Sequence, residues 1–159
     1  MKKFQYILGF ILFTLAFSFS SMNTTAQTKT LAFPNTSVKM DLPESYKTST
    51  ENGFSGLVNP SKGDQFVITA IPAPYNDMKK QFTPEALEAT GVKLKESEPY
   101  LTNGMVGTLY SATQTQGDIT MNKYILIFGN DITTYMIMAV YNLSTPSSEI
   151  LGYLDSLQL

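Results

Sequence analysis

Two pairs of glutamates are the side chains in this sequence whose spacing could support catalysis. Glu85 and Glu88 are three residues apart in a predicted helix, and Glu96 and Glu98 are two apart in a predicted strand, so each pair shares one face. Two carboxyl groups about 5–10 Å apart across a cleft can act as acid and base in glycoside hydrolysis. The same spacing is typical of a solvated charged face, which is the arrangement we expect for both pairs.

The sequence lacks the residues that most catalytic and metal sites require. It contains no histidine, cysteine, arginine or tryptophan. Ser–His and Cys–His nucleophile pairs therefore cannot form, and the usual zinc, copper and non-haem iron sites have no ligands. Apart from Lys2 and Lys3 at the N-terminus, the lysines are paired only at Lys79-Lys80 and Lys93/Lys95, so there is no basic footprint for nucleic acid. We expect no cofactor, no metal and no nucleic-acid partner.

A proline-rich segment between a predicted buried strand and a predicted helix is the first candidate for a binding site. Its prolines stiffen the exit from the strand, and loops held by a rigid scaffold often carry binding residues. Tyrosine and methionine are frequent in contact surfaces, although here they could instead pack over the sheet edge as core. The candidate residues are Pro74, Tyr75, Asn76, Asp77 and Met78.

Two Asn/Asp strings are weaker candidates, for a cation site. They are Asn76-Asp77 and Gly129-Asn130-Asp131. Both residue types are ordinary turn formers, and the calcium-loop pattern of alternating acids followed by a glycine and a distant glutamate is absent. We therefore interpret both strings as turns.

Three long runs rich in β-branched, aromatic and methionine residues must position any such site. They are Met105–Gln116, Ile119–Phe128 and Ile132–Tyr141, separated by short Gly/Asn/Asp turns. This pattern predicts an antiparallel meander. In the last two runs both alternating sets of positions are apolar, so both faces of the sheet must be covered. The sequence therefore predicts a layered α/β domain.

Shorter strands are predicted around the meander, and the residues from Lys47 to Gly53 are predicted to form a polar loop. The expected strands are Leu31–Phe33, Val38–Leu42, Phe54–Val58, Phe66–Ile71 and an outer strand at Val92–Thr102.

Two helices are predicted from their end signals. Thr83 is expected to cap the first, with Pro84 at its first position and Gly91 as its stop, giving about eight residues. The second is expected to start at Pro146 after a cap at Thr145 and to lie across the sheet. Its apolar stripe is Ile150, Leu151, Tyr153, Leu154 and Leu157.

The N-terminal residues 1–26 have the pattern of a secretory signal peptide. Lys2 and Lys3 precede an apolar run from Ile7 to Phe19, and Thr24-Thr25-Ala26 offers small residues for cleavage before Gln27. An uncleaved anchor is the alternative, but the run is shorter than the ~20 residues that a spanning helix needs. With no cysteine, a lipoprotein anchor is excluded. We expect a single secreted or periplasmic domain, residues 27–159, with no membrane span.

Several local strings make the chain similar to the PsbP-like family, which is named after an extrinsic subunit of photosystem II and shares its fold with a Ran-binding import factor of yeast. The likeness is greatest to secreted bacterial members, and no matching string is a catalytic motif. The strings are Leu42-Pro43, Gly53-Phe54-Ser55-Gly56, Ile71-Pro72, Tyr75-Asn76-Asp77-Met78, Phe82-Thr83-Pro84-Glu85, Asn103-Gly104 with Gly107, Lys123 to Gly129, and Ser156-Leu157.

This resemblance implies an α/β/α sandwich built on an antiparallel sheet of about six strands. It also implies action through protein contacts rather than catalysis, because family members with assigned roles bind proteins. We therefore expect a non-enzymatic accessory domain that contacts an envelope protein. The alternatives are a carrier of a small apolar ligand, with a pocket lined by Phe128, Met136 and Met138, and a carboxylate-based enzyme, for which the acids would have to converge rather than lie scattered as we expect.

The cleavage site can be tested directly. Protein recovered from the periplasm of an exporting bacterial host is expected to begin at Gln27 in intact-mass and N-terminal analysis, because small residues precede that bond. Ala26→Leu should accumulate the uncleaved precursor, whereas Thr28→Leu, beyond the bond, should not. Recovery of the whole chain starting at Met1 would contradict the signal-peptide interpretation.

Overall fold

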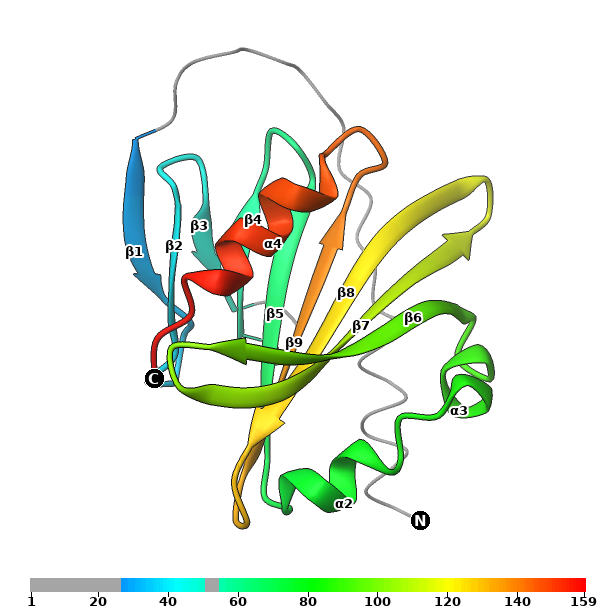
Figure 1. Ribbon diagram of the computed structural model, residues 1–159. Helices are drawn as coiled ribbons and strands as arrows, with labels where there is room; N and C mark the ends of the chain where they lie inside the picture. The colour runs from blue at the N-terminus through cyan, green and yellow to red at the C-terminus, as the bar shows by residue number, and fades with distance from the viewer. Residues whose placement is uncertain (1–26, 51–54) are drawn as a thin grey trace.

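A seven-stranded antiparallel sheet organises the computed structural model, which describes residues 27–50 and 55–159. Its strand order is β3-β4-β5-β9-β8-β7-β6, and β1 and β2 form a separate two-stranded hairpin beside it (Figure 1). The strands are β1 (Thr28–Ala32), β2 (Lys39–Pro43), β3 (Lys47–Ser49), β4 (Ser55–Asn59), β5 (Asp64–Ile71), β6 (Val92–Thr102), β7 (Met105–Gln116), β8 (Ile119–Gly129) and β9 (Thr134–Tyr141).

The prediction of about six strands was low by one. The additional strand is β3, which falls within the predicted polar loop and pairs with β4 at the sheet edge. Its three residues, Lys47–Ser49, carry no apolar side chain, so hydrophobic periodicity could not reveal it. Phe54, expected to begin β4, lies outside the described residues.

Both faces of the sheet are buried, as the two-sided apolar pattern predicts. One face carries Tyr124, Leu126 and Phe128 of β8 with the alternate residues of β9, in one core cluster. The opposite face carries Ile125 and Ile127 with Met136, Met138 and Val140, in a second cluster. Figure 1 shows that α4 (Ser147–Asp155) lies across the first face, which we call the α4 face.

The first predicted helix, α3 (Pro84–Glu88), is shorter than the expected length of about eight residues, and α2 (Tyr75–Lys79) was not predicted as a helix. The opposite face packs against these two helices, each of five residues. The cap of α3 is confirmed, because Thr83 Oγ1 accepts a hydrogen bond from the Ala86 amide at 3.2 Å. None of the helices in the described ranges is long and apolar enough to cross a lipid bilayer.

The predicted cap of the last helix was wrong. Pro146 occupies the N-cap position of α4, and no side chain caps the helix. The Thr145 hydroxyl instead donates to the buried carboxylate of Asp64. The apolar stripe is confirmed, since Ile150, Leu154 and Leu157 are fully buried in the first cluster.

The β6–β7 hairpin bends over the α4 face and ends beside the C-terminus of α4 (Figure 1). Its tip, at the predicted Asn103-Gly104 turn, has positive φ angles of 45° and 78°, which a two-residue hairpin turn of the primed type requires. Asn103 Nδ2 donates to the Leu157 carbonyl at 2.6 Å, and the Tyr100 hydroxyl donates to Asp155. These two bonds fix the hairpin, here named the arm, against α4.

A glycine permits this bend. A Cβ atom at Gly107 would lie 2.6 Å from the Ile127 carbonyl oxygen and 3.0 Å from Phe128 Cβ. Gly107→Ala should therefore lower the free energy of unfolding by about 1–3 kcal/mol in urea titration, because the neighbouring strand cannot yield.

The matched control is Gly152→Ala, in α4, where no atom lies within 4 Å of the added methyl group. That variant should be more stable by about 0.5–1 kcal/mol, since alanine is the better helix former. Equal stability changes in the two variants would contradict the close approach at Gly107.

Candidate functional site

The predicted binding segment is mostly helix rather than loop. Pro74 is the N-cap of α2, and Tyr75 lies in its first turn, where the Tyr75 hydroxyl is 2.8 Å from Thr108 Oγ1. Met78 is 3% exposed and packs into the core of the α2–α3 side. Asn76 and Asp77 are exposed and Pro74 and Tyr75 are half-buried, so Met78 is the residue of this segment that is withdrawn from a partner. The binding role of the segment stays a prediction.

The two Asn/Asp strings lie at the same end of the sheet, because the Tyr75 amide donates to the Asn130 carbonyl at 2.9 Å. Asn130 Oδ1 accepts from the amides of Ile132 at 2.8 Å and Thr133 at 2.9 Å, which is an ordinary turn arrangement. Asp77 contacts Lys80 at 3.3 Å. Within the described part of the chain, no three acidic side chains are grouped as a metal site would need.

Both glutamate pairs lie on solvated faces. Glu85 and Glu88 are exposed on α3, and hydrogen bonding at the helix start holds the pKa of Glu85 below its usual range. Glu96 and Glu98 are exposed on β6 and point to one face of the sheet, the α4 face. The sequence prediction of a shared strand face is therefore correct for the second pair.

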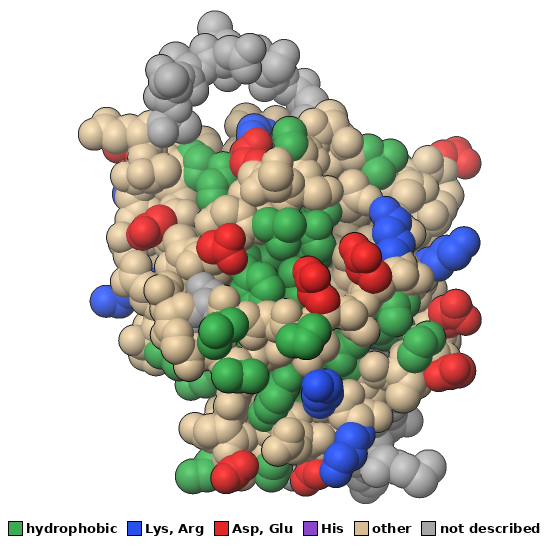
Figure 2. Space-filling view, in the orientation of Figure 1, with side chains coloured by type: hydrophobic (Ala, Val, Ile, Leu, Met, Phe, Trp, Pro, Cys, Tyr) green, Lys and Arg blue, Asp and Glu red, His purple; other side chains and the backbone are tan. Residues whose placement is uncertain are grey.

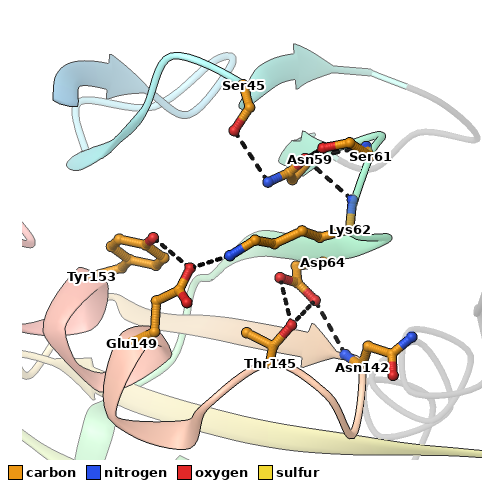
Figure 3. Close-up of polar contacts among 9 residues, drawn as sticks. All are labelled: Ser45, Asn59, Ser61, Lys62, Asp64, Asn142, Thr145, Glu149 and Tyr153. Carbon is orange, nitrogen blue, oxygen red and sulfur yellow. Dashed lines mark hydrogen bonds and ion pairs between the residues drawn. The ribbon is translucent and has the colours of Figure 1, made fainter. Parts of the chain in front are cut away.

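A polar network that the sequence did not reveal joins α4 to the strands (Figure 3). Lys62 Nζ lies 2.5 Å from Glu149 Oε1, and the Tyr153 hydroxyl donates to the same oxygen at 2.8 Å. Asp64 accepts from the Asn142 amide and from the Thr145 hydroxyl, each at 3.1 Å. The network therefore connects the β4–β5 turn, the β9–α4 loop and the helix itself.

Asp64 is the fully buried acid of this network. Burial raises the pKa of its carboxyl above the ordinary value, although the bonds from Asn142 and Thr145 oppose the shift. The hydroxyl of Tyr46 is buried beside it, without a hydrogen-bond partner in the described ranges. Burial, with the nearby Asp64 charge, raises the pKa of Tyr46 well above its usual range.

Acids and tyrosines therefore do gather here, contrary to the expectation that the acids lie scattered. The cluster nevertheless has a structural role, because it holds α4 and the loop before it in place. Asp64 has no exposed surface, and its oxygens already accept bonds from Thr145 and Asn142, so a substrate could reach it only by displacing the loop before α4. Glu149 is bound to Lys62 and Tyr153. The arrangement explains how α4 is positioned and provides no accessible acid–base pair.

The residues proposed for an apolar pocket do not lie together. Phe128 belongs to the cluster on the α4 face, whereas Met136 and Met138 belong to the cluster on the α2–α3 side. All three are at most 2% exposed. They cannot line one pocket, because the sheet separates them.

The surface between α4 and the arm combines partly exposed apolar groups with carboxylates. Figure 2 shows hydrophobic side chains gathered in the middle of this side of the molecule, with acidic side chains beside them. Tyr124 and Leu151 are partly exposed over the first core cluster. We call this region the front surface; its carboxylates are Glu96, Glu98 and Asp155. Leu101 and Val106 are cross-strand partners near the tip of the arm and are 71% and 63% exposed, but they alternate with Tyr100 and Gly107 and therefore lie on the other side of the arm, facing away from α4.

Neither the polar network around Asp64 nor the front surface could be predicted from local sequence patterns. Asp64 ends a run of turn formers, and Thr145 precedes a proline, so both matched local motifs that need no distant partner. The even spacing of Glu96 and Glu98 was the only signal for the front surface. Tyr124 and Leu151 matched core patterns, and their partial exposure depends on where α4 and the arm end.

The raised pKa of Asp64 predicts a specific pH dependence. A carboxyl with a higher pKa in the folded state than its unfolded value of about 4 binds its proton more tightly when folded. Its contribution to stability therefore falls as pH rises through that window. The free energy of unfolding of the wild type, minus that of Asp64→Asn, should decrease from pH 4 to pH 8 in urea titrations.

Asp118→Asn is the matched control, because Asp118 is exposed in the β7–β8 turn. The corresponding difference for that variant should be nearly flat over the same range. A difference that grows with pH for Asp64→Asn would show that the native state favours the charged carboxylate, against this prediction.

The fold is similar to solved structures, whereas no family model and no curated protein sequence matches the chain. A crystal structure of a protein from Bacteroides thetaiotaomicron VPI-5482 is similar with a TM-score of 0.52 and 14% identity, over 76% of this chain and 44% of that one. The solution structure of cyanobacterial PsbP (CyanoP) from Synechocystis sp. PCC 6803 is similar with a TM-score of 0.63 and 11% identity, over 88% of this chain and 98% of CyanoP. At such identities the likeness concerns the fold alone, and it confirms that this chain has a PsbP-like fold.

Proposed function

We propose that this protein is an exported, non-enzymatic accessory domain that acts by contacting another protein of the bacterial cell envelope. The observation that carries the proposal is the exposed apolar surface of the arm and of the front surface beside it. Leu101 and Val106 form an exposed apolar pair on the outer side of the arm, and Tyr124 and Leu151 are partly exposed on the α4 face. Exposed apolar surface of this kind often marks a protein contact.

Three further features support the proposal. The signal-peptide pattern of residues 1–26 favours export. The polar cluster around Asp64 is enclosed and engaged in holding α4, which favours a binding role over catalysis. The resemblance to the PsbP-like family, whose members with assigned roles bind proteins, favours the same conclusion.

The arm is well suited to present this surface. Its two strands pair from Val92 with Gln114 to Thr102 with Met105, with one register shift between Leu94 and Glu96, so the tip is part of a ladder rather than a loose loop. The bonds from Tyr100 and Asn103 to the end of α4 then fix the tip in place. A partner would meet a preformed surface, which reduces the entropy lost on binding.

Site-specific photo-cross-linking tests the proposal in living cells. A benzoylphenylalanine placed at Leu101 should form a covalent adduct with one envelope protein, seen as a discrete heavier band and identified by mass spectrometry. The matched control is Ile119, which is 55% exposed at the opposite end of β7 and β8 and should give no such band. Absence of a band from Leu101, or identical bands from both positions, would contradict a contact through the arm.

A further inference from the structure

We propose that the front surface receives a basic, extended segment of the partner protein, with lysine or arginine side chains directed at Glu96 and Glu98. This inference rests on the proposed function and names the chemistry of the partner. Its evidence is the distribution of charge and of partly exposed apolar groups between β6 and α4.

The carboxylates of β6 point toward the side of the sheet that α4 covers. Glu96 pairs with Ser111 and Glu98 with Leu109, and Leu109 belongs to the core cluster under α4. Both glutamates are exposed, so they stand at the open margin of that face. Their positions are two residues apart, which places them about 7 Å apart along the strand, the repeat of side chains on an extended peptide.

Among the described residues, no lysine lies within ion-pair distance of either carboxylate. The ion pairs among the described residues are Lys62 with Glu149 and Lys80 with Asp77, both elsewhere. Glu96 accepts only a long bond, 3.4 Å, from the Ser111 hydroxyl. Glu96 and Glu98 therefore repeat at the side-chain spacing of an extended peptide and form no ion pair with the described lysines. Such a pair of carboxylates is complementary to a basic segment.

Other charged side chains near Glu96 and Glu98 determine how far the negative charge extends. Asp155 lies at the end of α4, accepts from the Tyr100 hydroxyl and adds negative charge from the opposite side. Burial is the main cause that raises the pKa of Tyr100, and the charges of Asp155 and Glu98 raise it further, so both carboxylates lie near this hydroxyl. Lys93 and Lys95 stand at the start of β6, and Lys95 Nζ lies 3.4 Å from Asn122 Oδ1. The exposed carboxylates of β6 therefore follow its two lysines and lie in the middle of the strand.

Apolar groups beside the carboxylates suit the stems of long basic side chains. Glu96 pairs with Ser111 of β7, and Ser111 pairs with Tyr124 of β8. The partly exposed Tyr124 ring therefore lies on the same face of the sheet as Glu96. Tyr124 stacks on Tyr141 with ring centroids 5.6 Å apart, which holds it in place. A cation near an aromatic ring and two carboxylates gains both electrostatic and cation–π attraction, and its methylene stem covers apolar surface.

The test uses a fluorescein-labelled synthetic peptide of alternating lysine and leucine, with a glutamate–leucine peptide of the same length as its counterpart. The purified protein should bind the lysine peptide in fluorescence anisotropy, more weakly at 300 mM than at 50 mM NaCl, and should not bind the glutamate peptide. The double variant Glu96→Gln/Glu98→Gln should bind about five-fold more weakly, as expected for two exposed ion pairs.

The matched control is Glu44→Gln/Glu88→Gln, which removes the same charge from two exposed positions elsewhere. It should change binding by less than about two-fold, and all proteins should have the same unfolding midpoint. No binding of the lysine peptide, or equal weakening by both double variants, would overturn the inference. A cross-link from Leu101 obtained despite that result would leave the proposed function intact, so the two failures are distinguishable.

Discussion

Every part of this structure depends on burying both faces of one antiparallel sheet. In the central strand β9, Thr134–Tyr141, every residue except Tyr135 is buried. Burial of each large apolar side chain contributes about 1.5–3 kcal/mol, and the chain has no cysteine to supplement it with disulfides. Covering layers on both faces are therefore a condition of stability, and α4 with the β1–β2 hairpin on one side and α2 and α3 on the other supply them.

The covering layers are held by polar groups at a few points. Asp64 secures the loop that leads into α4, and the backbone of Lys39 exchanges two hydrogen bonds with Gln158 after the helix ends. A buried carboxyl is expensive unless it is hydrogen-bonded, and Asp64 accepts bonds from both Asn142 and Thr145. This cluster of acids and tyrosines is thus explained by the need to position a nine-residue helix over the sheet.

The front surface is a consequence of the same constraint. The helix α4 and the arm each cover part of one face, and the arm can bend over it because Gly107 lets the backbone of β8 approach closely. Between them, Tyr124 and Leu151 remain partly exposed over the core. Carboxylates on β6 and at the end of α4 surround this opening, so that the covering layers also create the surface on which the proposed contacts depend.

Elements whose signals lie within a few residues could be predicted from the sequence. Alternation in the β8 and β9 runs correctly assigned each side chain to one of two faces, the Asn103-Gly104 turn was identified from its residues, and Thr83 was recognised as a cap. Each of these signals arises from backbone preferences or side-chain periodicity within a few residues. The resemblance in local strings likewise anticipated the PsbP-like fold.

Features that join distant residues could be identified only in the folded protein. Thr145 had the type and position of a helix cap, yet a carboxylate 81 residues away in sequence binds its hydroxyl. The edge strand β3 exists because β4 offers it a ladder, since its own residues have no apolar pattern. The carboxylates of Glu96 and Asp155 border one surface because the arm is hydrogen-bonded to the end of α4, through contacts between distant residues that no local pattern encodes.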